Sequence, residues 1–393
     1  MTHAARANAT WNDTVEQLGG GDLLEKEARE TKGFQRPRKI RCAVDLLQCA
    51  FAYCLGKLGL RLTAAWAEGI GLANLSNVAL LERLRAAVPW LEAIAARLMA
   101  GLCDGATANA AAAADGDGAA AKPPGKGRLI RLIDATTVAK ADKAEREKGG
   151  VWRIHAAYDL PGERLSAFEV TDEKGAEAIN RLPVVPGEIR VADRVHCRAD
   201  DLADVIEQGG DPLVRAGWRS ARWLWPCGCQ MDLIRVLEGS ATGVIDMPVK
   251  LARAKAGPLA MRLIAVRLPK DKAMKAVADA RATAKDKGHK LDPRTLVAAE
   301  WTIIVTSLSK AELSTEEVLD IYRMRWRIEI AFKRMKSLLG LARPPGDCPR
   351  VAKAWVLCHL IAVLLTEAQL AAIGSSPRRG HALAPACGAP AAC

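Results

Sequence analysis

The sequence of 393 residues has 11 cysteines but no Cys-x-x-Cys pair. Because the number is odd and the cysteines are scattered, neither a disulfide framework nor a zinc module is indicated, and Cys227 and Cys229 are predicted to be packing residues. A long apolar run is also lacking. No apolar segment follows a basic start at the N-terminus, and the most apolar later run, 354–365, is soon followed by Glu367. We therefore expect a soluble protein in a reducing, cytoplasmic setting, without a membrane.

Positive charge is in excess, with 57 Lys and Arg against 45 Asp and Glu and a formal net charge of +12. Such an excess attracts polyanions, of which nucleic acid is the commonest and an acidic membrane surface the next. The length predicts two or three folded parts. Charge alone favours a nucleic-acid partner without selecting it.

Residues 1–104 have the pattern of helices separated by short turns, and we predict a helical N-terminal DNA-binding region. Segments 61–69 and 76–88 are joined through the turn Gly-Ile-Gly-Leu-Ala-Asn, and Ser76 is placed to cap the second segment. This pair resembles a helix-turn-helix and follows a basic stretch that contains Arg36, Arg38, Lys39 and Arg41. An ordinary helical hairpin in a bundle is the alternative.

An Ala/Gly-rich segment, 105–126, is predicted to be a linker, and strands are predicted to follow it. In the first part of a predicted α/β core, 127–204, one strand is predicted to end at Asp134. Segments 151–160 and 164–172 are predicted to form a hairpin, 173–182 a helix, and Gly-Glu-Ile-Arg-Val-Ala-Asp-Arg a strand that ends at Asp193. This order is typical of an α/β domain.

Residues 205–307 hold several further strand patterns and are predicted to be a β-rich insertion domain. The second part of the core, 308–372, begins with a long helix predicted at 315–338, which the cap signal Ser-Thr-Glu-Glu introduces and Gly340 ends. A second, apolar helix is predicted at 352–370. The tail, 373–393, has no periodicity and is predicted to be disordered.

One face of the predicted helix 315–338 carries Tyr322, Arg325, Glu329 and Lys336, because successive residues are rotated by about 100°. Glu329 is the only acid among seven Lys and Arg residues in 322–343. Together with Asp134 and Asp193 it supplies the carboxylates that hard divalent ions prefer. Each acid also has a purely structural alternative, namely a turn cap for Asp134 or an ion pair with Arg194, Arg325 or Lys333 for the other two.

The spacing Tyr-x2-Arg-x3-Glu-x6-Lys resembles the signature of the insertion sequence 4 family of DDE transposases, and the segments around it resemble that family's blocks in order. The resemblance implies an RNase H-like catalytic core with a β-rich insertion, preceded by an all-α N-terminal DNA-binding region. It also implies that Asp134, Asp193 and Glu329 are catalytic and hold two Mg²⁺ ions, for which Mn²⁺ can substitute. Tyr322, Arg325 and Lys336 are then expected to contact DNA phosphates.

Further DNA contacts are expected from Lys333 and Arg194, and from Trp301, which matches a tryptophan that stacks on a flipped base in some family members. A place in the core is the alternative for Trp301. His155 and His196 are predicted to be structural. Where the family often has a glycine soon after the second aspartate-arginine pair, this chain has Val-His-Cys.

The expected function is that of a transposase that binds the ends of its insertion sequence and catalyses metal-dependent DNA cleavage and strand transfer. Its partners would be double-stranded DNA and a second copy of the chain bound to DNA, with a nucleoid-associated location. Two alternatives stay open. One is a related nuclease without strand transfer, and the other is a domesticated DNA-binding protein that has lost catalysis.

Overall fold

The computed structural model of the protein describes residues 3–100, 124–141, 143–147, 150–254, 256–338, 340–341, 343–346 and 348–372. The chain divides into two compact units, of which one comprises 1–104 with 337–393 and the other 105–336. We call them the helical unit and the sheet unit. Most of the predicted linker and the whole predicted tail lie outside the described residues.

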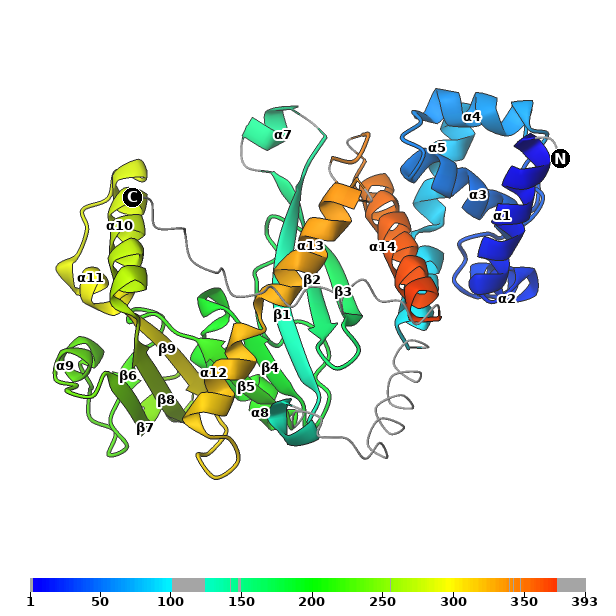
Figure 1. The fold of residues 1–393 in the computed structure, drawn as a ribbon. Coiled ribbons are helices and arrows are strands. Elements are labelled where there is room, and N and C mark those ends of the chain that lie inside the picture. The colour runs from blue at the N-terminus through cyan, green and yellow to red at the C-terminus, as the bar shows by residue number, and fades with distance from the viewer. Residues whose placement is uncertain are drawn as a thin grey trace, which may run out of the picture. The chain divides into compact units, whose positions relative to one another are not determined.

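The helical unit contains no strand in the part that the structure describes, which agrees with the prediction for its N-terminal residues. The helices α4 and α5 coincide with the predicted helix pair, and the Ser76 hydroxyl caps α5 by accepting a hydrogen bond of 3.2 Å from the backbone N–H of Ala79. Their use as a helix-turn-helix stays a prediction. The named helices of this unit are α1 (His3–Gln17), α2 (Gly21–Glu30), α3 (Ala43–Cys54), α4 (Leu60–Gly69), α5 (Asn77–Ala86) and α14 (Pro349–Ala372), and residues 88–100 are also helical (Figure 1).

The helix α14 confirms the predicted apolar helix. Its segment Pro349–Gln369 is the one described stretch long and apolar enough to cross a membrane, but most of it is buried. It packs against α3 and α5, as a core helix does. Residues 308–372, predicted to belong together, therefore contribute to both units, with the sheet unit ending at Lys336 and α14 lying in the helical unit.

The sheet unit is built on a single sheet of nine strands, so the α/β class is confirmed. Strands β1, β4 and β5 are parallel to one another and all other neighbours are antiparallel. The predicted hairpin is present as β2 and β3, and the predicted insertion 205–307 supplies β5 to β9 of this same sheet. In their spatial order the strands are β3 (Arg164–Asp172), β2 (Val151–Asp159), β1 (Ile130–Ala139), β4 (Ile189–Ala192), β5 (Asp211–Arg215), β9 (Trp301–Thr306), β8 (Leu259–Arg267), β7 (Val244–Leu251) and β6 (Trp223–Leu224).

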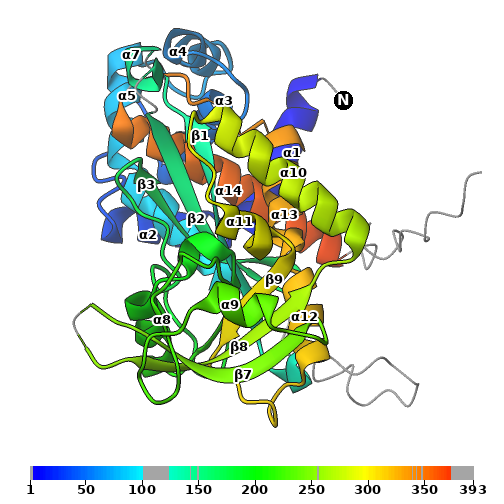
Figure 2. The same cartoon turned by 90° about the vertical axis from the view of Figure 1, so that its left-hand side faces the viewer.

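Helices cover both faces of the sheet. On one face, α8 (Ala199–Glu207) and α9 (Leu233–Glu238) pack on a hydrophobic cluster that includes Ile133, Ala192 and Ile303. The other face is crossed by α12 (Thr315–Arg323) and α13 (Trp326–Leu338) (Figure 1). Beside the first face, α11 (Pro293–Ala299) contacts α9 and β9, and α10 (Lys270–Asp286) lies on α11 (Figure 2). Two short helices, η1 (Pro124–Gly127) and α7 (Lys143–Glu147), lie on either side of β1 in the sequence.

Two expectations about local structure are wrong at the start of this unit. The first strand does not end at Asp134 but continues to Ala139, because residues 134–139 still pair with the antiparallel strand β2 after the parallel strand β4 has ended. The segment 173–182 is not a helix. Its carbonyl groups at Ile179 and Leu182 accept hydrogen bonds from the buried guanidinium of Arg190 instead of closing helical turns.

The expected single helix at 315–338 is also wrong, because α12 ends at Arg323 and α13 begins at Trp326. At the break the N–H groups of Met324 and Arg325 bond to carbonyls three residues back, which tightens the chain into one 3₁₀-like turn. The predicted capping box at Ser314 and Glu317 is present. Cys227 and Cys229 lie exposed in a turn rather than packed in a core, which corrects their prediction.

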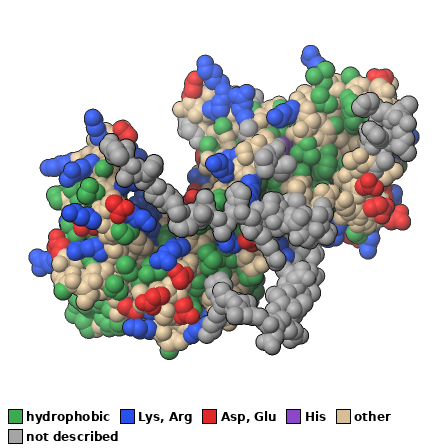
Figure 3. Space-filling view, in the orientation of Figure 1, with side chains coloured by type: hydrophobic (Ala, Val, Ile, Leu, Met, Phe, Trp, Pro, Cys, Tyr) green, Lys and Arg blue, Asp and Glu red, His purple; other side chains and the backbone are tan. Residues whose placement is uncertain are grey.

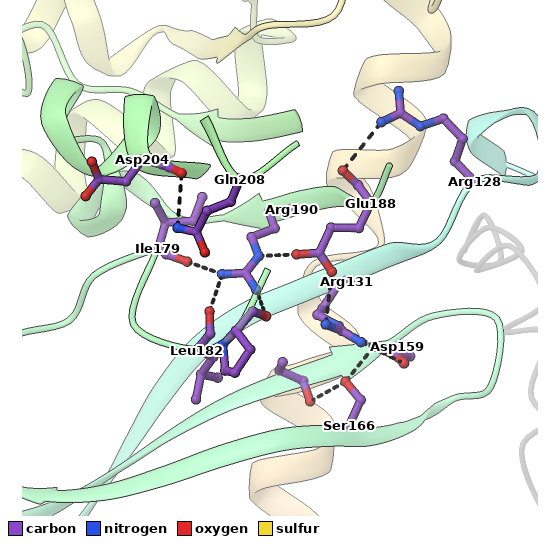
Figure 4. Close-up of polar contacts among 12 residues, drawn as sticks. Arg128, Arg131, Asp159, Ser166, Ile179, Leu182, Glu188, Arg190, Asp204 and Gln208 are labelled. Atoms are coloured by element: carbon purple, nitrogen blue, oxygen red, sulfur yellow. Dashed lines mark hydrogen bonds and ion pairs between the residues drawn. The ribbon is translucent and has the colours of Figure 1, made fainter. Parts of the chain in front are cut away.

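A buried ion network joins the N-terminal ends of β1 and β4 to the end of β2 (Figure 4). Arg131 contacts Asp159 at 2.7 Å and Glu188 at 3.0 Å, and Glu188 also pairs with Arg190. All four side chains are almost completely removed from water, so each charge depends on its partners. The network fixes the parallel pair β1 and β4 at the end opposite to Asp134 and Asp193.

Replacing Glu188 with Ala leaves two buried guanidinium groups without their shared carboxylate, and we expect a loss of about 3 to 5 kcal/mol in the free energy of unfolding. Urea unfolding monitored by circular dichroism measures this loss. Glu147→Ala is the control, because its ion pair with Lys143 spans 3.7 Å between exposed side chains and such pairs contribute about 0 to 1 kcal/mol. Equal effects of the two substitutions would contradict the role given to the network.

Candidate active site

Asp134 and Asp193 lie side by side, as the sequence predicted. Ile133 of β1 and Ala192 of β4 are register partners in this parallel pair. Asp134 and Asp193 directly follow these two residues, so the two aspartates lie next to each other. Ile133 and Ala192 belong to the cluster under α8, and since side chains alternate along a strand, both aspartates project toward the face crossed by α12 and α13. The sheet therefore brings two carboxylates to one point.

Arg325 connects Asp134 to Glu329. It lies at the break between α12 and α13, where its Nη1 is 3.4 Å from Oδ2 of Asp134 and its Nη2 is 2.5 Å from Oε1 of Glu329. The start of α13 is held in place by an ion pair of 2.6 Å between Arg327 and Glu163 at the turn of the β2–β3 hairpin. Asp134 and Glu329 thus meet at one guanidinium, whose charge also acts on the neighbouring Asp193.

The two aspartates have pKa values shifted in opposite directions. Burial raises the pKa of Asp134 from 3.8 to about 6; Arg325 opposes this shift and the charge of Asp193 adds to it. Burial also acts to raise the pKa of Asp193, but the hydrogen bond and charge of His196, the backbone N–H of Val195 and the charge of Arg325 together lower that pKa. At neutral pH, Asp134 is a carboxylate whose negative charge the protein compensates only in part.

His196 is a site residue that the sequence analysis missed. Its buried ring places Nδ1 at 2.9 Å from Oδ1 of Asp193, and the same oxygen accepts the backbone N–H of Val195 at 3.0 Å. The two side chains meet because residues 194–196 form a short 3₁₀-helix, η2 (Arg194–His196), in which positions three apart lie above one another. The signal in the sequence was the spacing Asp-x2-His. His155, in contrast, bonds to Thr171 at 2.9 Å, and burial lowers its pKa to about 4.

The predicted DNA-contacting residues differ in how far their side chains are exposed. Tyr322 is half-buried beside Arg325, and burial raises its pKa. Lys336 is exposed, two helical turns beyond Glu329 on the same side of α13, and the protein around its amine lowers its pKa. Lys333 and Arg194 are exposed.

Trp301 does not join this group. Its ring is buried in the cluster under α8, on the face of the sheet opposite to Asp134, with the Arg267 guanidinium 4.9 Å from the ring centroid. In this conformation Trp301 is a core residue, which was the alternative to base stacking. Base stacking on Trp301 stays a prediction that requires the ring to be uncovered.

The three carboxylates of the candidate site suit a hard divalent cation only in part. Asp134 and Asp193 offer adjacent oxygen ligands that repel each other, and the environment of Asp134 disfavours its negative charge. Within the part of the chain that the structure describes, however, no three acidic, histidine or cysteine side chains are grouped closely enough to hold a metal ion. Glu329 is engaged by Arg325 and its side chain is 54% exposed, so it joins the aspartates only when this ion pair opens.

Comparison with known proteins agrees with this geometry. Residues 125–365 match the family model described as the transposase DDE domain, and the chain belongs to that family. It is 35% identical over 365 residues to InsL, assigned as the transposase of insertion sequence element IS186A in Escherichia coli K12. The aligned region covers 91% of this chain and 93% of InsL.

Two further relatives carry transposase names. The transposase for insertion sequence element IS421 of Escherichia coli is 35% identical over 366 residues, 91% of this chain and 93% of that protein. The transposase for IS231F of Bacillus thuringiensis subsp. israelensis is 28% identical over 271 residues, 61% of this chain and 55% of that protein. The homology to insertion-sequence transposases thus extends over most of the chain.

The raised pKa of Asp134 predicts that Asp134→Asn stabilises the metal-free protein. An acid whose pKa is higher in the folded protein than in the unfolded chain destabilises the fold when it is ionised. For Asp134 this loss of stability begins as pH rises above the unfolded pKa of 3.8 and reaches its full size above the folded pKa of about 6. The variant should therefore equal the wild type below pH 4 and exceed it by up to about 3 kcal/mol above pH 6. Urea unfolding in chelator-containing buffer at several pH values measures the difference.

Asp193→Asn is the matched control with the opposite sign. The folded pKa of Asp193 is lowered, so its carboxylate contributes stability above the unfolded pKa and loses it as pH falls. This variant should be less stable than the wild type at pH 7. A stability gain from Asp193→Asn, or none from Asp134→Asn, would contradict the charge distribution described here.

Proposed function

We propose that this protein binds the ends of its insertion sequence and catalyses metal-dependent DNA cleavage and strand transfer on an RNase H-like core. The observation that carries the proposal is the pair Asp134 and Asp193, side by side on the sheet, with Asp134 linked to Glu329 through Arg325. The family membership supports the reaction class.

Asp134, Asp193 and Glu329 would hold two Mg²⁺ ions, for which Mn²⁺ can substitute. Bound divalent metal would activate the attacking oxygen and stabilise the leaving oxygen of the phosphodiester. Arg325 compensates Asp134 and Glu329 in the structure described here. With the carboxylates engaged in metal binding, the planar guanidinium of Arg325 would be available to bind a phosphate with two hydrogen bonds.

We assign Tyr322, Arg325, Glu329 and Lys336 to the signature of the insertion sequence 4 family. Arg325 and Lys336 would contact phosphates near the cleaved end, with Tyr322 beside them and with Lys333 and Arg194 as further cations. The face drawn in Figure 3 shows Lys and Arg side chains gathered over the part of the sheet unit that holds α10, a distribution that suits a polyanion. Pairing of two ends would require a dimer on DNA, and a nucleoid-associated location follows.

A nuclease without strand transfer shares the same carboxylates, so only the reaction products separate it from a transposase. A DNA-binding protein that has lost catalysis is disfavoured by Asp134. Holding this buried carboxylate ionised costs stability at neutral pH, and it repels phosphates, so a protein that only binds DNA gains nothing from it.

Glu329→Gln tests the proposal at its centre. The substitution keeps the size of the side chain but removes its charge, so we expect cleavage of the element's ends in Mg²⁺ to fall by at least a hundredfold while binding of labelled ends changes less than threefold. Gel assays of binding and of cleavage measure both quantities. Glu316→Gln, in the first turn of α12, is the control and should cleave normally.

Two outcomes would contradict the proposal. Cleavage by Glu329→Gln at the wild-type rate would show that Glu329 is not needed for cleavage. Cleaved ends that are never joined to a target plasmid, under conditions in which cleavage is complete, would favour the nuclease.

His196 is predicted to orient Asp193. His196→Ala removes the contact to Oδ1, and we expect cleavage to fall 10- to 100-fold, as is usual when the partner of a ligand is lost, with a higher Mg²⁺ concentration needed for half-maximal rate. His196→Asn, which retains a donor, should recover part of the loss. A reduced rate with an unchanged Mg²⁺ dependence would mean that the histidine has only a packing role.

A further inference from the structure

A third charged side chain lies in the same row of the sheet as the two aspartates. Ala192 of β4 is the register partner of Val214 in the parallel strand β5. The residues that directly follow these two, Asp193 and Arg215, are therefore neighbours, and Asp134 lies on the other side of Asp193. The carboxyl ends of the three parallel strands thus carry two acids and one arginine in a row.

The side chain of Arg215 points to the same face of the sheet as the aspartates. Val214 belongs to the hydrophobic cluster under α8, and side chains alternate along a strand, so Arg215 projects toward the face crossed by α12 and α13. There α12 contacts β5, and Tyr322 lies in its last turn. Burial raises the pKa of Tyr322, and the charges of Arg325 and Arg215 oppose this rise, so both guanidinium groups lie near its hydroxyl.

The guanidinium of Arg215 is free to bind a ligand. It is exposed, and within the described part of the chain its side chain makes no hydrogen bond or ion pair. The neighbouring Asp193 instead accepts hydrogen bonds from a backbone N–H and the ring of His196. Arg325, on the Asp134 side of the pair, is engaged by two carboxylates. Two arginines therefore flank the aspartates, and Arg215 is the one without an acidic partner.

We propose that Arg215 is a catalytic residue that binds a nonbridging oxygen of the phosphate group at which DNA is cut and joined. The inference rests on the proposed function, because it takes a DNA phosphodiester as the substrate. Open α/β sheets bind their ligands outside the carboxyl ends of the parallel strands, where Arg215 lies. The planar guanidinium matches phosphate oxygens with two hydrogen bonds.

This role belongs to the chemical step more than to the binding of DNA. During phosphoryl transfer negative charge is spread over the nonbridging oxygens. Donors that are already in place where charge develops increase the rate more than the affinity. Arg215 meets this condition because it is fixed on a strand of the sheet beside the predicted metal ligands. It lies outside the Tyr-Arg-Glu-Lys signature, which is confined to α12, α13 and the turn between them.

The substitution R215Q in the full chain tests the proposal. We expect single-turnover cleavage of the element's ends in Mg²⁺ to fall by about a hundredfold, as is usual when one such donor is lost, while binding of labelled ends changes by less than about threefold. R215K keeps the charge without the planar fork and should recover part of the rate. The matched control is R222Q, which removes an exposed arginine beside β6 at the far edge of the same sheet and should cleave at the wild-type rate.

Two further measurements separate catalysis from a structural role. For R215Q both the Mg²⁺ concentration at half-maximal rate and the midpoint of thermal unfolding should equal those of the wild type. A change in the Mg²⁺ requirement would mean that Arg215 positions Asp193, and a lower midpoint would mean that it only supports the fold. Either result would overturn the proposal.

Equal cleavage rates of R215Q and R222Q would also overturn it, as would a loss of rate explained by weaker binding of the ends. In all these cases normal cleavage by the wild type would leave the proposed function intact. A wild-type protein that does not cleave the ends in Mg²⁺ would contradict the proposed function, and the role of Arg215 would fall with it.

Discussion

The contact of one guanidinium with two carboxylates organises the candidate active site. Arg325 reaches Asp134 from one nitrogen and Glu329 from another, and without it the acids of the sheet and of α13 would repel each other across a partly buried space. The arginine lies at the break between α12 and α13, so the helix break and the charge compensation are parts of one arrangement. A cation at this point compensates carboxylates from both the sheet and α13.

The sheet supplies the two aspartates of the candidate site. Its parallel strands β1 and β4 are held together by buried ion pairs at one end, and the aspartates lie toward the other end. Arg131 and Arg190 are held by Glu188 where β1 and β4 begin, and the register that results places Asp134 beside Asp193 where β4 stops. A buried network of this kind gives little net stability. It does exclude a shift of one residue in register between β1 and β4, which would place the two aspartates on opposite faces of the sheet.

The sequence predicted the strands, the hairpin and the helix pair α4 and α5, because these depend on local alternation, capping and spacing. It failed where a distant group decides the local structure. Residues 173–182 have a helical composition, yet the Arg190 side chain claims their carbonyls, and no glycine or proline marks the break before Trp326. His196 was missed because a lone histidine has no periodicity, and Trp301 was ambiguous because burial on one face of a sheet depends on the neighbouring strands.

The charge distribution links the two binding events of the proposed reaction. The protein is strongly basic, but the acids around Arg325 form a local negative patch that disfavours an incoming phosphate until cations balance it. With divalent metal bound by the carboxylates, Arg325 would lose its two ion pairs and could face DNA. Linkage then requires the reverse effect as well, so that DNA bound at the site must raise the affinity for metal by the same factor.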